Sequence, residues 1–149
     1  MIKFEMLSRD NIDEVYALEK VCFEDPWSFE SFESELSNKI SVYIVARDEE
    51  TDKIVGYGGV WMMYDCGDIT NIAVSPESRR MGLGEKILEL LTNISREKGM
   101  ESLGLEVRAS NDAAIGLYEK CGFTPCGIRK KYYKGKEDAV LMSKSLMEE

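Results

Sequence analysis

Histidine is absent from this 149-residue chain. Its absence excludes a Ser-His-Asp triad, a Cys-His dyad and any metal site with an imidazole ligand. No stretch approaches the ~20 apolar residues of a membrane-spanning helix, and the first ten residues lack the basic and apolar segments of a secretory signal. We therefore expect a cytoplasmic protein with no membrane partner, in which carboxylates, Tyr, Cys, Lys or water carry any proton transfer.

Cysteine is also sparse, with only Cys22, Cys66, Cys121 and Cys126. No two of them form a C-x-x-C pair, which argues against a zinc ribbon or a thioredoxin-type site. A chain of this length needs no disulfide framework for stability. We therefore expect reduced thiols and no metal.

Positive charge is in deficit, with 19 Lys and Arg against 28 Asp and Glu, a net charge of −9 and a pI of about 4.7. This balance argues against binding nucleic acid through its phosphates. The first 60 residues carry 14 acids and 6 bases, whereas the remainder carries 14 acids and 13 bases. Both charged regions can be solvated surfaces. Alternatively, the acidic region attracts a cationic substrate. The acids gather at Glu24, Asp25, Glu30, Glu33 and Glu35, and the bases at Arg129, Lys130, Lys131, Lys134 and Lys136.

The order of hydrophobic patterns predicts one α/β domain over residues 1–149. Two helices are expected after Asp10 and Ser28, each of which is a plausible N-cap. A long helix is expected from Gly82, and a shorter one is capped by Asn111. Alternating or β-branched segments predict seven strands, at residues 2–6, 41–46, 54–63, 68–74, 102–107, 123–129 and 139–143. We predict a mixed sheet whose first strands form an antiparallel meander.

The most informative segment is residues 72–86, in which a strand and a short loop lead to Arg79-Arg80-Met81-Gly82-Leu83-Gly84 at the start of a helix. Amides at a helix start have no intrahelical partner, and the helix dipole makes that end positive. Glycines let a phosphate approach the backbone, and arginines add charged donors. The pattern is neither a Walker motif nor the dinucleotide-binding G-x-G-x-x-G. It is either a pyrophosphate site or an ordinary glycine-containing helix start with two exposed arginines.

Two further residues are candidates for acid–base chemistry. Glu106 interrupts an apolar strand, so its carboxylate either faces solvent or lines a cleft, where burial would suit it to general-base work. Tyr118 falls on the inner face of the following helix, where residue statistics alone favour a core aromatic with a satisfied hydroxyl.

Several segments, in the same order along nearly the whole chain, make this sequence resemble the GNAT acetyltransferase superfamily. More narrowly, it is similar to the RimI-type ribosomal-protein alanine N-acetyltransferases. The Arg/Gly segment resembles the acyl-CoA signature of the superfamily, and a Tyr twelve positions after the Glu of Leu-Glu-Val-Arg-Ala-Ser-Asn is specific to the group. The matching segments are Pro26-Trp27-Ser28, Asn71 to Val74, Arg79 to Gly84, Leu105 to Asn111, Ala114 to Glu119, Cys121-Gly122-Phe123, Arg129 to Tyr133 and Glu137-Asp138-Ala139.

The resemblance implies a GNAT fold, with about seven strands that run parallel at the cofactor cleft and about four helices. It implies that Glu106 is the proton acceptor and Tyr118 the proton donor, while Trp27 and Tyr132 are candidates for shaping the peptide site. Acetyl-CoA is the implied co-substrate. The residues that would bind it are Ile72, Ala73, Val74, Arg79, Arg80, Met81, Gly82, Leu83, Gly84, Glu85 and Asn111.

The implied reaction is transfer of acetyl from acetyl-CoA to a basic protein N-terminus, the N-terminal alanine of small-subunit ribosomal protein eighteen. Two other functions stay open. One is a GNAT enzyme that acetylates another N-terminus, a lysine or a small amine. The other is a non-catalytic acetyl-CoA-binding module, which would not need Glu106 and Tyr118. The sequence leaves the oligomeric state open.

Overall fold

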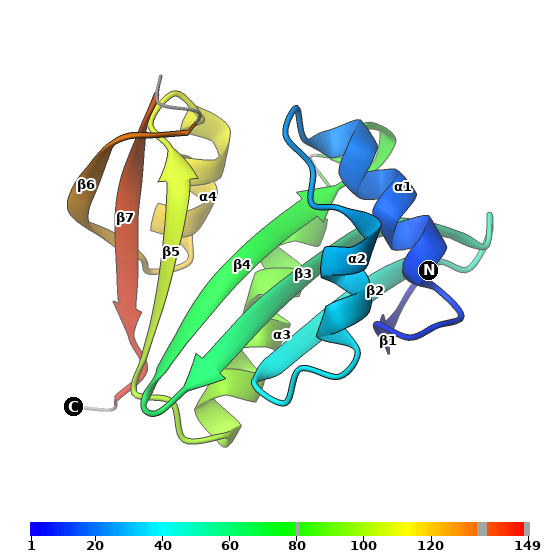
Figure 1. Ribbon diagram of the computed structural model, residues 1–149, viewed down its shortest axis with the longest axis horizontal. Coiled ribbons are helices and arrows are strands. Elements are labelled where there is room, and N and C mark those ends of the chain that lie inside the picture. Colours follow the sequence, from blue (N-terminus) through cyan, green and yellow to red (C-terminus); the bar gives the residue numbers. More distant parts are fainter. Residues whose placement is uncertain (80, 134–136, 148–149) are drawn as a thin grey trace.

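The structure is a computed structural model that describes residues 1–79, 81–133 and 137–147. Within these residues, seven strands form one mixed sheet, and four α-helices cover its two faces (Figure 1). In chain order the elements are β1 (Ile2–Met6), α1 (Ile12–Cys22), α2 (Phe29–Glu35), β2 (Ser41–Asp48), β3 (Lys53–Met63), β4 (Cys66–Val74), a 3₁₀ turn (Pro76–Ser78), α3 (Leu83–Glu97), β5 (Ser102–Arg108), α4 (Asp112–Lys120), β6 (Thr124–Tyr133) and β7 (Glu137–Ser145).

The sheet confirms the predicted architecture. Its strand order is β1-β2-β3-β4-β5-β7-β6, and every neighbouring pair is antiparallel except β4 and β5. One apolar cluster joins α1 and α2 to β2, β3 and β4, and the other joins α3 and α4 to the opposite face. The predicted hairpin turn at Gly135, and Lys134 and Lys136 beside it, lie outside the described residues.

The two parallel strands separate soon after they begin. Residues 66–68 of β4 pair with residues 102–104 of β5, and no pairing follows, although β4 runs to Val74 and β5 to Arg108. β4 stays hydrogen-bonded to β3, and β5 stays hydrogen-bonded to β7. The sheet therefore opens between β4 and β5, and we call this opening the fork (Figure 1). Thr70 is an extra residue in β4, and a bulge of this kind bends a strand and increases its twist.

Helix α3 approaches the sheet closely because β3 carries glycines where it crosses. A Cβ at Gly58 would stand 2.6 Å from Cγ2 of Ile87, and one at Gly59 would overlap the Tyr43 ring on the other face. The inner stripe of α3 follows the predicted spacing, with Ile87 and Leu91 fully buried. Burying one such side chain stabilises a fold by about 1.5–3 kcal/mol.

The start of α1 differs from the prediction by one residue. Asn11, not Asp10, occupies the N-cap position, and its side chain is 1% exposed. Its amide donates to the Glu5 carboxylate and to the Met6 carbonyl, both at 2.9 Å, and its oxygen accepts from the Ser8 amide. Asn11 is favoured at the N-cap because its side-chain amide both donates and accepts hydrogen bonds in a buried corner, whereas an Asp carboxylate only accepts them. The predicted caps Ser28 and Asn111 are confirmed.

Candidate functional site

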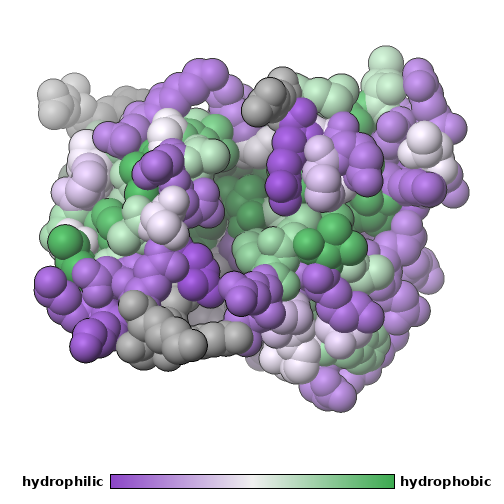
Figure 2. All heavy atoms as spheres, turned by 90° about the horizontal axis from the view of Figure 1, so that it is seen from above, coloured by the Kyte–Doolittle hydropathy of each residue, from purple (hydrophilic) through white to green (hydrophobic). Residues whose placement is uncertain are grey.

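A cavity of about 810 Å³ opens between the end of β4, the start of α3 and helix α4. Figure 2 views the molecule from this end and shows a hollow with an apolar floor between polar rims. The lining comes from the end of α1, the end of β4, the start of α3 and one face of α4. These residues are Cys22, Phe23, Ile72, Ala73, Val74, Ser78, Arg79, Gly82, Leu83, Gly84, Glu85, Asn111, Ala113, Ala114, Leu117 and Lys120.

The start of α3 lies at this cavity without a side-chain cap. Gly82 is the N-cap residue with φ of +76°, a left-handed conformation that glycine adopts without strain. The amides of the first helical turn, which includes Gly84, have no acceptor within the helix, and the dipole makes this end positive. The arrangement suits an anionic group such as a diphosphate.

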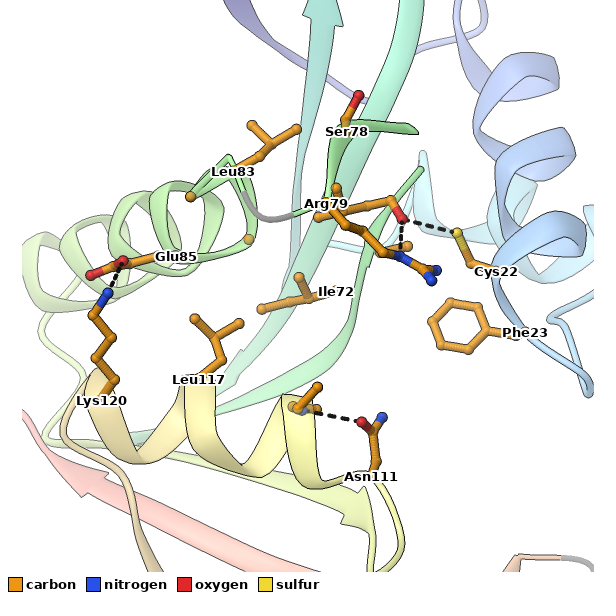
Figure 3. Close-up of a pocket in the computed structure, with 16 residues that line it drawn as sticks. Cys22, Phe23, Ile72, Ser78, Arg79, Leu83, Glu85, Asn111, Leu117 and Lys120 are labelled. Atoms are coloured by element: carbon orange, nitrogen blue, oxygen red, sulfur yellow. Dashed lines mark hydrogen bonds and ion pairs between the residues drawn. The ribbon is translucent and has the colours of Figure 1, made fainter. Parts of the chain in front are cut away.

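The end of β4 is tied to the loop that follows it. The Val74 carbonyl accepts a hydrogen bond from Nε of Arg79 at 3.2 Å and another from Sγ of Cys22 at 3.5 Å (Figure 3). Burial raises the pKa of the Cys22 thiol, and the nearby Arg79 opposes that shift only in part. Arg79 is thus held at the cavity wall, with its Nε–H already donating a hydrogen bond to Val74.

Helix α4 forms the opposite wall. Asn111 caps it by accepting from the Ala114 amide at 3.1 Å, which leaves the Asn111 amide group beside the cavity. Nζ of Lys120 lies 3.0 Å from the Glu85 carboxylate, so an ion pair joins α4 to α3 (Figure 3). The hydrogen bond to Glu85 and its charge raise the pKa of Lys120.

Nine of the eleven residues expected to bind the co-substrate line this one cavity. Met81 is not among the lining residues and is 73% exposed, and Arg80 lies outside the described residues. Sequence reasoning missed several lining residues, among them Cys22, Phe23 and Lys120. Each is far in sequence from the Arg/Gly segment and carries no motif, so only the fold brings it to the cavity.

Glu106 lies on the sheet face that α1 and α2 cover, because its neighbours Leu105 and Val107 face the α3 side. The residue as a whole is exposed and its side chain keeps 30% of its accessible surface, so the carboxylate is not enclosed in a buried cleft. Its carboxylate pairs with Nη1 of Arg129 at 3.2 Å. A hydrogen bond to this carboxylate raises the pKa of Tyr132, whose ring lies 4.8 Å below the Arg129 guanidinium carbon.

Tyr118 lies on the opposite face, half-buried on α4 against the cluster that contains Leu105 and Val107. Its ring meets Phe123 edge-on with centroids 6.0 Å apart. Neither Glu106 nor Tyr118 is among the cavity-lining residues, and their catalytic roles stay predictions. The two residues therefore lie on opposite faces of the sheet.

A buried polar network, unforeseen from the sequence, supports the bulged part of β4. Glu19 is 2% exposed and accepts from the Trp27 amide at 2.8 Å, from Nδ2 of Asn71 at 3.1 Å and from the Tyr57 hydroxyl. Burial, followed by the charge of Glu19, raises the pKa of Tyr57. The Tyr43 hydroxyl bonds Thr70 and Asn71. The network joins the loop that carries Trp27 to the strand that lines the cavity.

The model of the Acetyltransferase (GNAT) family matches residues 12–123, more than half of the chain. The chain belongs to the GNAT acetyltransferase family. This GNAT protein is an acetyl-CoA-dependent N-acetyltransferase.

Its similarity to known proteins extends over almost its full length. It is 43% identical over 135 residues to a Bacillus subtilis protein described as a candidate ribosomal protein bS18-alanine N-acetyltransferase, covering 89% of this chain and 88% of that one. It is 36% identical over 140 residues to the ribosomal protein bS18-alanine N-acetyltransferase of Escherichia coli, covering 92% and 93%. The crystal structure of the ribosomal-protein-S18-alanine N-acetyltransferase from Escherichia coli matches with a TM-score of 0.91 at 32% identity, over 100% and 96% of the two chains.

Two further structural findings concern binding partners. Among residues 1–79, 81–133 and 137–147, no group of three or more Cys, Asp or Glu side chains is arranged to hold a metal ion. Within the same residues, no helix has both the length and the apolar character to cross a membrane.

Proposed function

We propose that this protein transfers acetyl from acetyl-CoA to the N-terminal alanine of ribosomal protein bS18 in the cytoplasm. The observation that carries the proposal is the cavity between the end of β4 and helix α4, which joins the uncapped start of α3 to apolar walls. A diphosphate fits the helix start, and an apolar arm fits the walls formed by Ile72, Leu83 and Leu117. The acceptor follows from the names of full-length relatives in Bacillus subtilis and Escherichia coli.

In the proposed mechanism, two groups on either side of the fork handle the protons. An α-amino group has a pKa of about 7.7–8.0, so at neutral pH most of it is protonated and not nucleophilic. Glu106 removes that proton through water, and the amine attacks the thioester carbon directly. Tyr118 then protonates the CoA sulfur as it leaves.

Backbone groups of β4 support the transition state in this mechanism. Beyond Asp68, the edge of β4 that faces β5 has no sheet partner, so the amides of residues 72–74 that point away from β3 are free to bind a carbonyl oxygen that becomes negative. Holding amine and thioester together supplies a further part of the rate. No covalent enzyme intermediate is required.

Mass spectrometry of ribosomal proteins, incubated with the enzyme and acetyl-CoA, tests the proposal. We expect one acetyl group on the N-terminus of bS18 and none on its lysines. A panel of peptides with altered first residues, run beside lysine and polyamines, tests the other acceptors. Preference for a free amine would replace the proposed acceptor. Absence of CoA release with every amine would contradict catalysis itself and favour a binding module.

A further inference from the structure

A second carboxylate lies beside Glu106 at the apex of the fork. Asp68 is the last residue of β4 that pairs with β5, and its partner is Gly104. Paired residues on neighbouring strands direct their side chains to the same face of a sheet. Gly104 has no side chain, and Oδ1 of Asp68 lies 3.4 Å from where a Cβ of that residue would stand. The Asp68 carboxyl group therefore leans over β5.

Glu106 comes two residues after Gly104, so its side chain projects from the same face, next to Asp68. Burial, and then the negative charge of Glu106, raises the pKa of Asp68. Two interacting carboxylates titrate as a pair, because a proton on one relieves its repulsion with the other. This burial is only partial, because Asp68 as a whole residue is still exposed, so a proton that reaches it can leave to water.

The charged groups around this pair come from four other elements. Arg129 and Tyr132 of β6 contact Glu106. Arg108, further along β5, pairs with Glu137 of β7 at 3.2 Å. On the side of β3 and α2, Trp61 is the register partner of Asp68, and its indole N–H donates to the buried Glu35 carboxylate at 2.5 Å. Glu106 is thus the acidic group that acts on Asp68, and Glu106 is itself paired with Arg129.

We propose that Asp68 is the proton-accepting partner of Glu106, taking the proton that Glu106 removes from the acceptor ammonium and releasing it to solvent. The inference rests on the proposed function. Asp68 does not contact the amine. It acts only through Glu106, from which it receives the proton, and is therefore a positioning residue and not a catalytic one.

The protons and bonds of this scheme balance. An ammonium and acetyl-CoA yield an amide, the CoA thiol and one free proton. That proton travels from nitrogen to Glu106, to Asp68 and to water. The N–C bond forms as the C–S bond breaks, and the sulfur takes a proton from Tyr118. The second proton lost by the nitrogen restores the Tyr118 phenol.

Asp68→Asn, compared with Asp65→Asn, tests this role. Asp65 is an exposed acid in the turn before β4, so its variant has the same change in net charge. We expect Asp68→Asn to lower the plateau of kcat for an Ala-starting peptide about tenfold. We also expect the acidic limb of kcat to move to lower pH by about half a unit, because a neighbouring negative charge is lost. Asp65→Asn should leave both features unchanged. A wild-type pH profile for Asp68→Asn, or equal changes in the two variants, overturns the inference.

A second measurement does not depend on activity. Carbon-13 NMR follows the titration of the Asp68 carboxyl in the full chain and in Glu106→Gln. We expect the Asp68 midpoint to fall in Glu106→Gln, since the repelling charge is gone. An unmoved midpoint contradicts the pairing of the two carboxylates. If the wild-type protein acetylates no N-terminal peptide, the proposed function fails, while the NMR titration still decides whether Asp68 and Glu106 share a proton.

Discussion

The guanidinium of Arg129 lies 3.2 Å from the Glu106 carboxylate, across the intervening strand β7. The group proposed to remove a proton is therefore already paired with a cation from another strand. Both side chains are partly exposed, and exposed ion pairs contribute only about 0–1 kcal/mol. For the proposed reaction, replacing this guanidinium by a substrate ammonium would therefore cost little.

Removing the guanidinium tests this relationship. In Arg129→Ala the Glu106 carboxylate loses the cation that stabilises it. The acidic limb of kcat should therefore move to higher pH by about half a unit. The pH profile with an Ala-starting peptide measures the shift. Arg96→Ala, on the outer side of α3, removes the same charge and should leave the profile unchanged. An identical profile in both variants would show that Arg129 does not influence the base.

Replacing Glu106 by Gln removes the proposed base with almost no change in size. We expect kcat to fall about 100-fold or more and its rise toward alkaline pH to flatten. Acetyl-CoA affinity, measured by calorimetry, should stay the same because Glu106 does not line the cavity. Glu101→Gln, just before β5, is the matched control. A retained alkaline rise in Glu106→Gln would mean that another group takes the proton.

Tyr118→Phe keeps the ring against Phe123 and removes only the hydroxyl. We expect turnover to fall about tenfold to 100-fold while acetyl-CoA affinity changes less than about twofold, since the acid acts in the transition state. Tyr64→Phe, at a side chain that is 93% exposed, controls for the substitution itself. Wild-type turnover in Tyr118→Phe would remove this tyrosine from the acid role.

Cys22 reports on occupation of the cavity. Burial raises its pKa, so at pH 8 less of it is thiolate and it should alkylate more slowly than the exposed Cys126. Saturating acetyl-CoA should slow Cys22 further and leave Cys126 unaffected, as peptide mapping by mass spectrometry would show. Equal labelling of Cys22 with and without acetyl-CoA would place the co-substrate elsewhere.

Replacing each of two glycines by alanine should change the free energy of unfolding in opposite directions. Gly82 has φ of +76°, and a left-handed conformation costs an L-residue about 1–2 kcal/mol, so Gly82→Ala should lower the free energy of unfolding by that amount. Gly116 lies inside α4 with open space around it, and Gly116→Ala should raise that free energy by about 0.5–1 kcal/mol. Urea unfolding measures both. A stabilising Gly82→Ala would contradict the left-handed cap.

Local interactions explain which elements the sequence predicted well. The caps Ser28 and Asn111 bond to amides three residues away, and the inner stripe of α3 repeats with the helical period. The Asp10 cap was wrong because Asn11 is chosen by a buried corner between β1 and α1, a tertiary environment. The predicted strands near 123–129 and 139–143 are longer in the structure, because β7 pairs with β6 on one side and with β5 on the other.

The sequence alone determined the order of strands and helices along the chain, the uncapped glycine start of α3 and the family to which the chain belongs. Those features depend on periodicity, backbone conformation and short motifs, all of which act between near neighbours along the chain. The tertiary structure decided where β4 and β5 separate, which residues meet at the cavity, and that Glu106 and Tyr118 stand on opposite faces. Register and strand divergence place Asp68 and Arg129 beside Glu106 from distant parts of the sequence, and no local pattern encodes such a meeting.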